Sequence, residues 1–215
     1  VVIKVNGQIA GCALSIIVDY DKFDDNHTYR EITSDYSFDS HDPDGDVLYG
    51  IDVFIRAMPL ILNFDTNVTF VIAGGGDKTL EKEYLTLAKS LGVADQLTIT
   101  GVIAHQKMQK LIPSADLVVI PSFYEAVSLA ALEALSCGVP VIASNVGGLP
   151  FIINDTNGAL FKVGCDKDLA SKVNSHLRDW PNTLLKGEAA REAILEKHTW
   201  KSVANQTLYV YDCFG

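Results

Sequence analysis

The stretch ADLVVIPSFYEAVSLAALEALSCGVPVIASNVGG, residues 115–148, decides the fold. It opens at 116–121 with a short run rich in Val and Ile, which is typical of a buried parallel strand. Residues 126–137 are rich in Ala and Leu and predict a buried helix, which a Gly and a Pro end. Residues 139–143 predict a second strand. The Gly-rich loop 145–148 follows at the carboxyl end of that strand, where open α/β sheets bind their ligands.

Two glutamates, Glu125 and Glu133, bracket the predicted helix. Their eight-residue spacing would place both side chains on roughly the same side of that helix, about 12 Å apart along its axis. Carboxylates at that separation can accept hydrogen bonds from the hydroxyls of a nucleoside diphosphate sugar, and a helix N-terminus can bind its phosphates. The alternative is a pair of solvated glutamates on an amphipathic helix. Apolar neighbours on both sides of Glu133 weigh against this alternative.

The segment PSFYEAVSLAALEALSCGVPVIASNVGGLPFII, residues 121–153, resembles the donor-binding segment of the retaining glycosyltransferases of family 4, the group 1 transferases with the GT-B fold. The resemblance extends from Gly50 to about Tyr211, and Glu125 and Glu133 match the E-x7-E motif of that family. It implies that Glu125, as the catalytic residue, would bind hydroxyls of the transferred sugar, and that Glu133 would bind the ribose. It also implies the C-terminal half of a GT-B enzyme, an α/β domain with a Rossmann-like, doubly wound parallel sheet.

Three glycines follow another predicted strand, residues 68–73, and precede a helix predicted over 78–91. A strand, a Gly-rich turn and a helix bring backbone amides close to phosphate, although any tight turn between a strand and a helix favours Gly. Gly74, Gly75 and Gly76 are therefore candidates for contact with the nucleotide, with a plain turn as the alternative.

The remaining candidates lie along the expected carboxyl edge of the sheet. The resemblance places Val102 and Ile103, which follow a strand predicted at 97–101, beside the base of the nucleotide. The candidates around the first glutamate are Ser122, Ala126, Val127, Ser128 and Leu129. The resemblance implies a nucleotide diphosphate sugar, UDP- or GDP-hexose, as the donor, and no separate cofactor is expected.

The chain departs from the family pattern where phosphate is bound. Tyr49 occupies the position of the usual Lys, the position of the usual Arg falls near Asp44, and residues 126–128 (Ala-Val-Ser) replace Gly-Phe-Gly. Two missing cations near a diphosphate would cost on the order of several kcal/mol of transition-state stabilisation. Either the domain has low or no activity, or another cation substitutes, the candidates being Arg56, Lys78 and Lys107.

Residues 1–46 are interpreted as a poorly defined N-terminal segment near the interdomain linker, and residues 47–215 as the nucleotide-sugar-binding domain. The segment includes strands predicted at 1–5 and 13–18. Its acidic loop, 40–46, has spaced aspartates, but a solvated loop is favoured over a metal site because the residues do not fit a calcium-binding loop. If residues 1–46 do align with the region of the family's interdomain linker, the N-terminal, acceptor-binding half of a GT-B enzyme is missing.

The chain is acidic, with 27 Asp and Glu against 17 Lys and Arg, which argues against nucleic acid or anionic lipid as a partner. The four cysteines lack metal-binding spacing and predict reduced thiols in the cytoplasm. No apolar run approaches the roughly 18 residues of a membrane span, so membrane association, such as a peripheral site at the inner membrane face, would need absent parts of the protein.

The final stretch HTWKSVANQTLYVY, 198–211, resembles the closing helix of the family, which packs on the other domain of GT-B enzymes, with Thr199 as the N-cap. The leading hypothesis is hexose transfer with retention to a glycan or lipid-linked acceptor, as in polysaccharide biosynthesis. A non-catalytic nucleotide-sugar-binding or regulatory module is the second hypothesis. A GT-B epimerase or a dinucleotide-dependent oxidoreductase is the third, and the oxidoreductase is disfavoured because the last Gly of G-x-G-x-x-G is missing.

Overall fold

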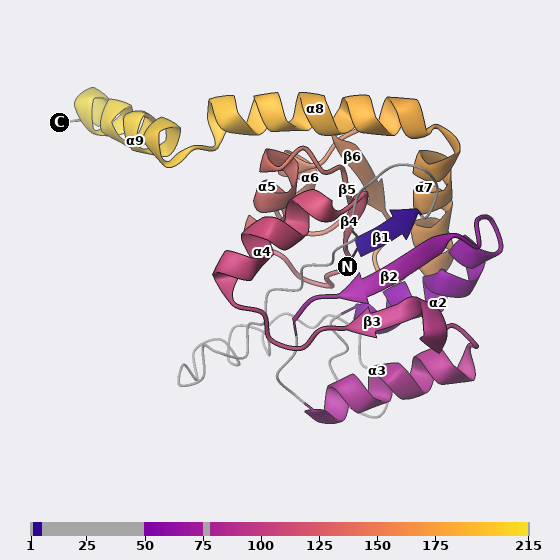
Figure 1. Ribbon diagram of the computed structural model, residues 1–215. Coiled ribbons are helices and arrows are strands. Elements are labelled where there is room, and N and C mark those ends of the chain that lie inside the picture. Colours follow the sequence, from indigo (N-terminus) through magenta and orange to yellow (C-terminus); the bar gives the residue numbers. More distant parts are fainter. Residues whose placement is uncertain (1, 6–49, 75–77, 215) are drawn as a thin grey trace.

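The computed structural model describes residues 2–5, 50–74 and 78–214 (Figure 1). They form an α/β domain around a six-stranded sheet with the order β3-β2-β1-β4-β5-β6. The strands are β1 (Val2–Val5), β2 (Val68–Ile72), β3 (Leu97–Ile99), β4 (Leu117–Ile120), β5 (Val141–Ser144) and β6 (Gly158–Phe161). The β2–β3, β4–β5 and β5–β6 pairs are parallel, which confirms the predicted Rossmann-like class.

Among the described strands, β1 is the one that differs from the expected parallel direction. It lies between β2 and β4 and pairs antiparallel with both, with Val2 opposite Val71 on one side and Val118 on the other. The strand predicted at 1–5 therefore forms, but an apolar run has the same pattern in either direction, so the sequence did not reveal its orientation. The strand predicted at 13–18, the acidic loop at 40–46 and the boundary at 46–47 lie outside the described residues.

The spacing of apolar residues predicts helices at 47–62, 78–91, 106–111, 166–178 and 183–197, and the structure has a helix whose ends lie within four residues of each of these ranges. The α-helices are α2 (Ile51–Leu62), α3 (Lys78–Ser90), α4 (His105–Leu111), α5 (Leu129–Ser136), α6 (Leu149–Ile152), α7 (Asp166–Arg178), α8 (Trp180–Lys197) and α9 (Trp200–Phe214), and the 3-10 turns are η2 (Ala94–Gln96) and η3 (Ile112–Ser114). α5 starts three residues later than predicted, and the short helix α6 was not predicted.

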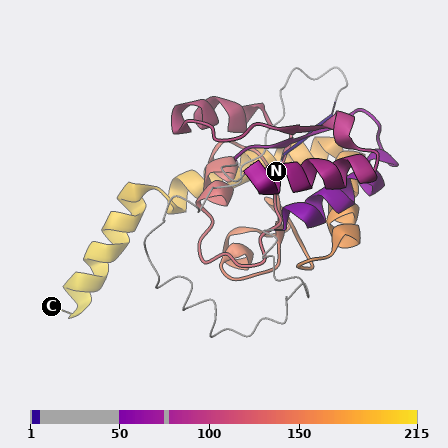
Figure 2. The ribbon, with the colours of Figure 1, turned by 90° about the horizontal axis from the view of Figure 1, so that it is seen from below.

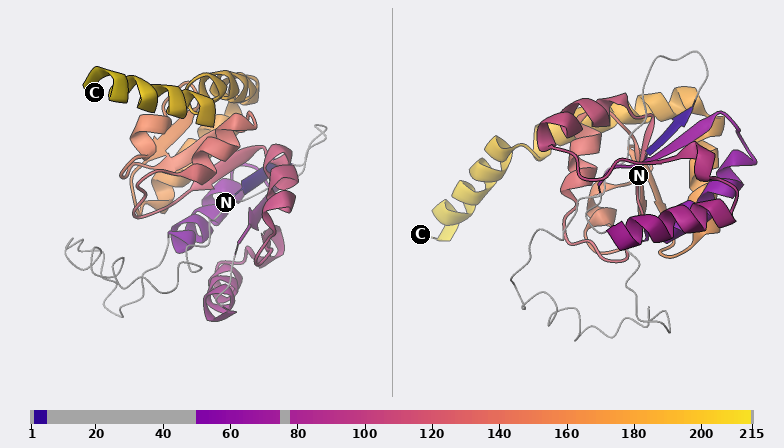
Figure 3. Two further views of the ribbon diagram at one scale, coloured as in Figure 1. Left: turned by 90° about the vertical axis from the view of Figure 1, so that its left-hand side faces the viewer. Right: turned by 60° about the horizontal axis from the view of Figure 1, so that its bottom comes forward.

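Alternate residues of β4 contribute to opposite faces of the sheet, and each face has its own core. Leu117 and Val119 belong to the cluster that includes residues of α2 and α7. Val118 and Ile120 belong to the cluster that includes residues of α5 and α8. Figure 3 shows helices on both sides of the sheet, as a doubly wound architecture requires.

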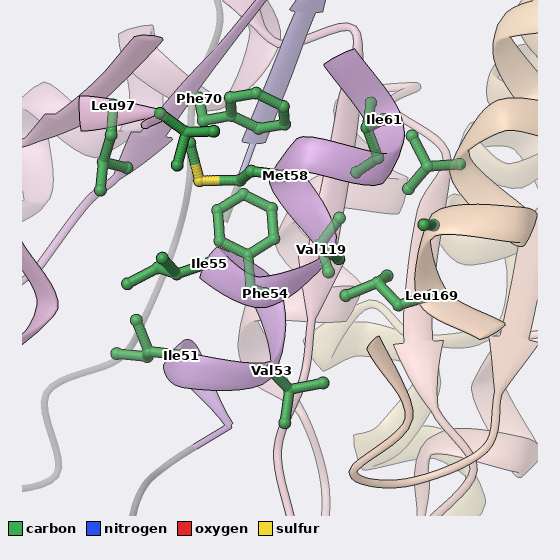
Figure 4. Close-up of a cluster of buried hydrophobic side chains, with 14 of the residues drawn as sticks. Ile51, Val53, Phe54, Ile55, Met58, Ile61, Phe70, Leu97, Val119 and Leu169 are labelled. Carbon is green, nitrogen blue, oxygen red and sulfur yellow. The ribbon is translucent and has the colours of Figure 1, made fainter. Parts of the chain in front are cut away.

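The first of these clusters is built largely on α2, which is apolar around most of its circumference. Figure 4 shows side chains of α2 packed between those of β2 and α7. The rings of Phe54 and Phe70 meet edge to face, with centroids 5.6 Å apart and planes at 72°. This packing fixes α2 against the sheet, with its N-terminus at the carboxyl end of β4, where Gly50 approaches Pro121.

α9 projects away from the rest of the domain at the end of α8 (Figures 1 and 2). The Thr199 hydroxyl accepts a hydrogen bond from the Ser202 N–H at 3.1 Å, which confirms the predicted N-cap. The large apolar side chains of α9 that are exposed are Trp200, Val203, Leu208, Tyr209, Val210 and Tyr211. Among the described helices, none is both long enough and apolar enough to cross a membrane.

Three of the four cysteines lie in the described ranges, and all three are free thiols. Cys137 follows the last residue of α5 and is half-buried against the second core cluster. Cys12 lies outside the described residues.

His176 is a buried histidine on α7, with an exposed fraction of 6%. Its Nδ1–H donates to the carbonyl oxygen of Lys172 at 2.8 Å. Burial lowers the pKa of His176, and the charges of Lys186 and Lys172 lower it further, while backbone hydrogen bonds at Lys172 and Gly158 oppose the shift. The imidazole is therefore held in the neutral form between α7, α8 and β6.

Acidification is expected to destabilise the domain through His176. Because the pKa of His176 is lower in the folded chain than in the unfolded chain, the unfolded state takes up a proton first, and the free energy of unfolding falls below about pH 6.5. We expect His176→Gln to remove a loss on the order of 1 kcal/mol between pH 7.5 and pH 5. Denaturant unfolding at both pH values measures it, with the exposed His198→Gln as control. Equal acid losses in the two variants would contradict the prediction.

Candidate functional site

The site lies where two parallel neighbours, β4 and β5, end side by side, with Ile120 paired to Ala143. The loop after β4 carries Glu125, and the loop after β5 carries Gly147 and Gly148. The Gly148 N–H donates to the Glu125 carbonyl oxygen at 2.9 Å. The two loops therefore meet at the backbone of the predicted catalytic residue.

The Glu125 side chain is held inside this junction, and only 8% of the residue is exposed. The Ser122 hydroxyl donates to Glu125 Oε2 at 3.4 Å, which brings two of the predicted site residues together. Burial raises the pKa of Glu125, and the hydrogen bond from Ser122 lowers it in part. A buried carboxylate with one oxygen still available is suited to accept hydrogen bonds from ligand hydroxyls.

The predicted start of the helix after this loop is wrong. α5 begins at Leu129 rather than Ala126, because Ser128 is its N-cap and accepts a hydrogen bond from the Ala131 N–H at 3.3 Å. Glu125 therefore precedes α5 by four residues, and helical geometry does not relate it to Glu133. A serine before an Ala- and Leu-rich run is a typical N-cap signal, so the start of the helix at Leu129 was predictable from the sequence.

Glu133 lies on the second turn of α5, on the side away from the core. The buried positions of this helix are Ala130, Ala131, Ala134 and Leu135, whereas Glu133 is half-buried. Among the described residues, its carboxylate has no hydrogen-bond or ion-pair partner. Its partly exposed position explains how a charge is tolerated on so apolar a helix, and it leaves the carboxylate free for a ligand.

The start of α5 offers free backbone donors beside Glu125. The N–H groups of Leu129 and Ala130 have no acceptor within the part of the chain that the structure describes. Predicted site residues Ala126, Val127 and Leu129 are exposed, the last two with exposed fractions of 58% and 60%. An anion could therefore reach this helix terminus from solvent.

The backbone N–H of Gly74 is hydrogen-bonded within the protein. Gly74 adopts a φ of +121°, and its N–H donates to the Gly101 carbonyl oxygen at 3.2 Å and towards the Thr100 hydroxyl at 3.4 Å. This amide joins the ends of β2 and β3, so it is not free for phosphate and the plain-turn alternative describes it. Gly75 and Gly76 lie outside the described residues.

The other predicted residues, Val102 and Ile103, follow β3. Val102 is 60% exposed, while Ile103 packs against the second core cluster with Met108 and Leu111. Two strands, β2 and β1, separate β3 from β4 in the sheet order. The predicted residues thus form two groups along the carboxyl edge, one around Glu125 and one after β3.

Of the three candidate cations, two are engaged with carboxylates. Arg56 Nε lies 3.6 Å from Asp52 Oδ2, and Lys78 Nζ lies 2.8 Å from Glu81 Oε2. Lys107 is exposed on α4. Within the described ranges, no group of three or more His, Cys, Asp or Glu side chains is placed to hold a metal ion.

Sequence reasoning placed the loop after β5 at the ligand-binding edge of the sheet but missed its contacts with the loop that carries Glu125. A Cβ on Gly147 would lie 1.9 Å from the Glu125 carbonyl oxygen, and a Cβ on Gly148 would lie 1.9 Å from that of Ala126. Ser144, at the end of β5, is fully buried and hydrogen-bonds to the Ser122 carbonyl oxygen. The available signals were the paired glycines and a serine that ends an apolar strand.

Comparison with known proteins gives one family and one fold. The model of the family described as glycosyl transferases group 1 matches residues 47–193. An uncharacterized glycosyltransferase from Methanocaldococcus jannaschii is 39% identical over 164 residues, which are 75% of this chain and 41% of that relative.

Solved structures agree with these matches. Sucrose-phosphate synthase from Thermosynechococcus elongatus superposes with a TM-score of 0.69 at 28% identity, over 79% of this chain and 43% of that one. Anabaena HepE in complex with UDP-glucose has the same fold, with a TM-score of 0.68 at 23% identity, over 77% of this chain and 45% of that one. The chain spans less than half the length of each of these three proteins.

Proposed function

Because the chain belongs to the group 1 glycosyl transferases, we propose that its domain binds a nucleotide diphosphate sugar at the carboxyl ends of β4 and β5. The observation that carries the proposal is the Glu125 carboxylate, buried between two joined loops and beside the free N–H groups of α5. A buried carboxylate is costly unless it is hydrogen-bonded, and hydroxyls of a bound sugar would supply hydrogen bonds. The donor is a UDP- or GDP-hexose, and the activity belongs to the whole protein.

The sugar, the diphosphate and the ribose of the donor each have a complementary group in this arrangement. Glu125 would accept hydrogen bonds from hydroxyls of the transferred sugar, the N–H groups of Leu129 and Ala130 would face the diphosphate, and Glu133 would bind the ribose. We propose that transfer follows the retaining route of family 4, in which the acceptor hydroxyl attacks from the side that the diphosphate leaves. Stabilisation of that diphosphate is then the main contribution of the protein.

A second candidate function is a non-catalytic module of the same fold that holds a nucleotide sugar without turnover. Its support is the engagement of Arg56 with Asp52 and of Lys78 with Glu81, which leaves neither cation committed to a diphosphate. Without these two cations, the leaving group would be stabilised mainly by backbone donors and by Lys107, the third candidate. Binding would survive this loss better than transfer, because charge on the diphosphate grows in the transition state.

The exposed apolar side chains of α9 support a further part of the proposal. Trp200 is 86% exposed and Tyr211 is 68% exposed, although both are large and apolar. We propose that α9 packs on the remainder of the protein, which corresponds to the length of the relatives that this chain does not cover. That remainder would carry the site for the glycan or lipid-linked acceptor.

Ligand-observed NMR with the 215-residue chain tests the donor site. The ligands are UDP, GDP, ADP and their glucose and mannose conjugates, each titrated to millimolar concentration. We expect one nucleotide family to bind, and Glu133→Ala to weaken that binding about tenfold, because the ribose loses a charged hydrogen-bond acceptor. Glu196→Ala, an exposed glutamate on α8, is the matched control.

The outcomes separate the candidate functions. Binding of one nucleotide that Glu133→Ala weakens and Glu196→Ala leaves unchanged supports the donor site and identifies the base. A folded chain that binds none of the ligands contradicts it. Release of free nucleotide from the bound sugar donor would favour the transferase over the binding module.

A further inference from the structure

The hydroxyl of Ser144 joins the end of β5 to the start of the loop after β4. Ser144 is the last residue of β5 and has an exposed fraction of 0%. Its Oγ lies 2.5 Å from the Ser122 carbonyl oxygen and 3.4 Å from that of Ile120. A hydroxyl has one proton to donate, so the nearer acceptor, Ser122, receives the hydrogen bond.

Ser122 connects the hydroxyl of Ser144 to the carboxylate of Glu125. The same residue whose carbonyl oxygen is held by Ser144 donates its own hydroxyl to Glu125 Oε2. The hydroxyl–carboxylate contact, at 3.4 Å, is long, and small movements of the Ser122 backbone would break it. Further along, the loop is held again at the Glu125 carbonyl oxygen by the Gly148 N–H.

We infer that Ser144 is a positioning residue for the Glu125 carboxylate and acts through Ser122. The inference rests on the proposed function, because Glu125 is taken to bind the donor. Ser144 does not itself need to touch the ligand, since it is fully buried beneath the loop. Without its hydroxyl, the Ser122 carbonyl oxygen loses its partner, the backbone at Ser122 moves, and the side-chain contact to Glu125 is lost.

The test is donor affinity and its dependence on pH, measured by calorimetry with the UDP- or GDP-sugar that the wild-type chain binds. We expect Ser144→Ala to weaken binding about tenfold. The Ser122 hydrogen bond lowers the pKa of Glu125, so its loss raises that pKa, and donor affinity begins to fall at a higher pH on acidification. A role confined to stability would leave the pH profile where it is.

Three further variants test whether the Ser144 hydroxyl acts on Glu125 through Ser122. Ser144→Thr keeps the hydroxyl in a residue suited to strands and should restore the wild-type pH profile. Ser114→Ala removes a half-buried hydroxyl of η3, which donates to the Leu111 carbonyl oxygen at the end of α4, and should leave affinity unchanged. In a Ser122→Ala background the effect of Ser144→Ala should shrink, because the two residues act in series.

The failure of this inference differs from the failure of the proposed function. If the wild-type chain binds no nucleotide sugar, the proposed function fails and Ser144 has no donor-binding role. If the wild-type chain binds but Ser144→Ala matches it in affinity and pH profile, only the role of Ser144 is overturned. Full additivity with Ser122→Ala would also overturn it, because the two residues would then act independently.

Discussion

Gly50→Ala is expected to reduce the free energy of unfolding by about 3 kcal/mol or more. Gly50 precedes α2 with a φ of +76°, a conformation that costs residues with a Cβ about 1–2 kcal/mol. A Cβ there would also lie 1.9 Å from the Pro121 carbonyl oxygen, so the start of α2 would have to move away from the end of β4. Denaturant unfolding of the variant and the wild type measures the loss.

Gly92→Ala is the matched control for Gly50→Ala. Gly92 has nearly the same φ, +71°, but a Cβ there meets no other atom within 4 Å. Its loss of about 1 kcal/mol would therefore represent the backbone conformation alone, and the difference between the two variants would represent the contact with Pro121. Equal losses in the two variants would show that α2 moves away from β4 without cost.

The sequence allowed much of the fold to be predicted because the signals were local. The apolar spacing after Gly50 gave α2, and the short Val- and Ile-rich runs gave β4 and β5 to within two residues. Thr199 was found as an N-cap because a hydroxyl before a helical run has one common structural role. Periodicity and capping depend on neighbours in the chain, which the sequence contains directly.

The remaining features depend on contacts between distant segments. The direction of β1 follows from how the chain returns to the sheet, which its four residues do not encode. Gly74 was a candidate for phosphate, but its amide bonds to Gly101, a partner set by the pairing of β2 with β3. The start of α5 was misplaced for a different reason, since alanine content was given more weight than the N-cap signal at Ser128.

For the site, the sequence indicated the principal residues but not their arrangement. Glu125 and Glu133 were found through the family motif, yet the helical relation assumed between them does not exist. The support that Ser144 and Gly148 give to the loop of Glu125 arises because β4 and β5 are parallel neighbours. Such contacts appear only when the carboxyl ends of both strands are placed together.

Gly148→Ala is expected to weaken donor binding at least about tenfold, with a loss of about 1–3 kcal/mol in the free energy of unfolding. Gly148 has a φ of −82°, which alanine adopts freely, so backbone strain plays no part. The added Cβ would lie 1.9 Å from the Ala126 carbonyl oxygen, which forces the loops after β4 and β5 apart. That movement also stretches the bond from the Gly148 N–H to the Glu125 carbonyl oxygen. Calorimetric titration with the bound nucleotide sugar measures the affinity.

Gly92→Ala again serves as the control. Its expected loss in the free energy of unfolding is near the lower end of the range expected for Gly148→Ala. Gly92 also lies at the end of α3, away from β4 and β5. If donor affinity depended only on overall stability, the two variants would differ little. If it depends on the position of Glu125, Gly148→Ala loses affinity and Gly92→Ala keeps it. Wild-type affinity in a folded Gly148→Ala chain would show that the contact between the two loops does not determine donor affinity. It would also contradict the role of Glu125 in binding the sugar.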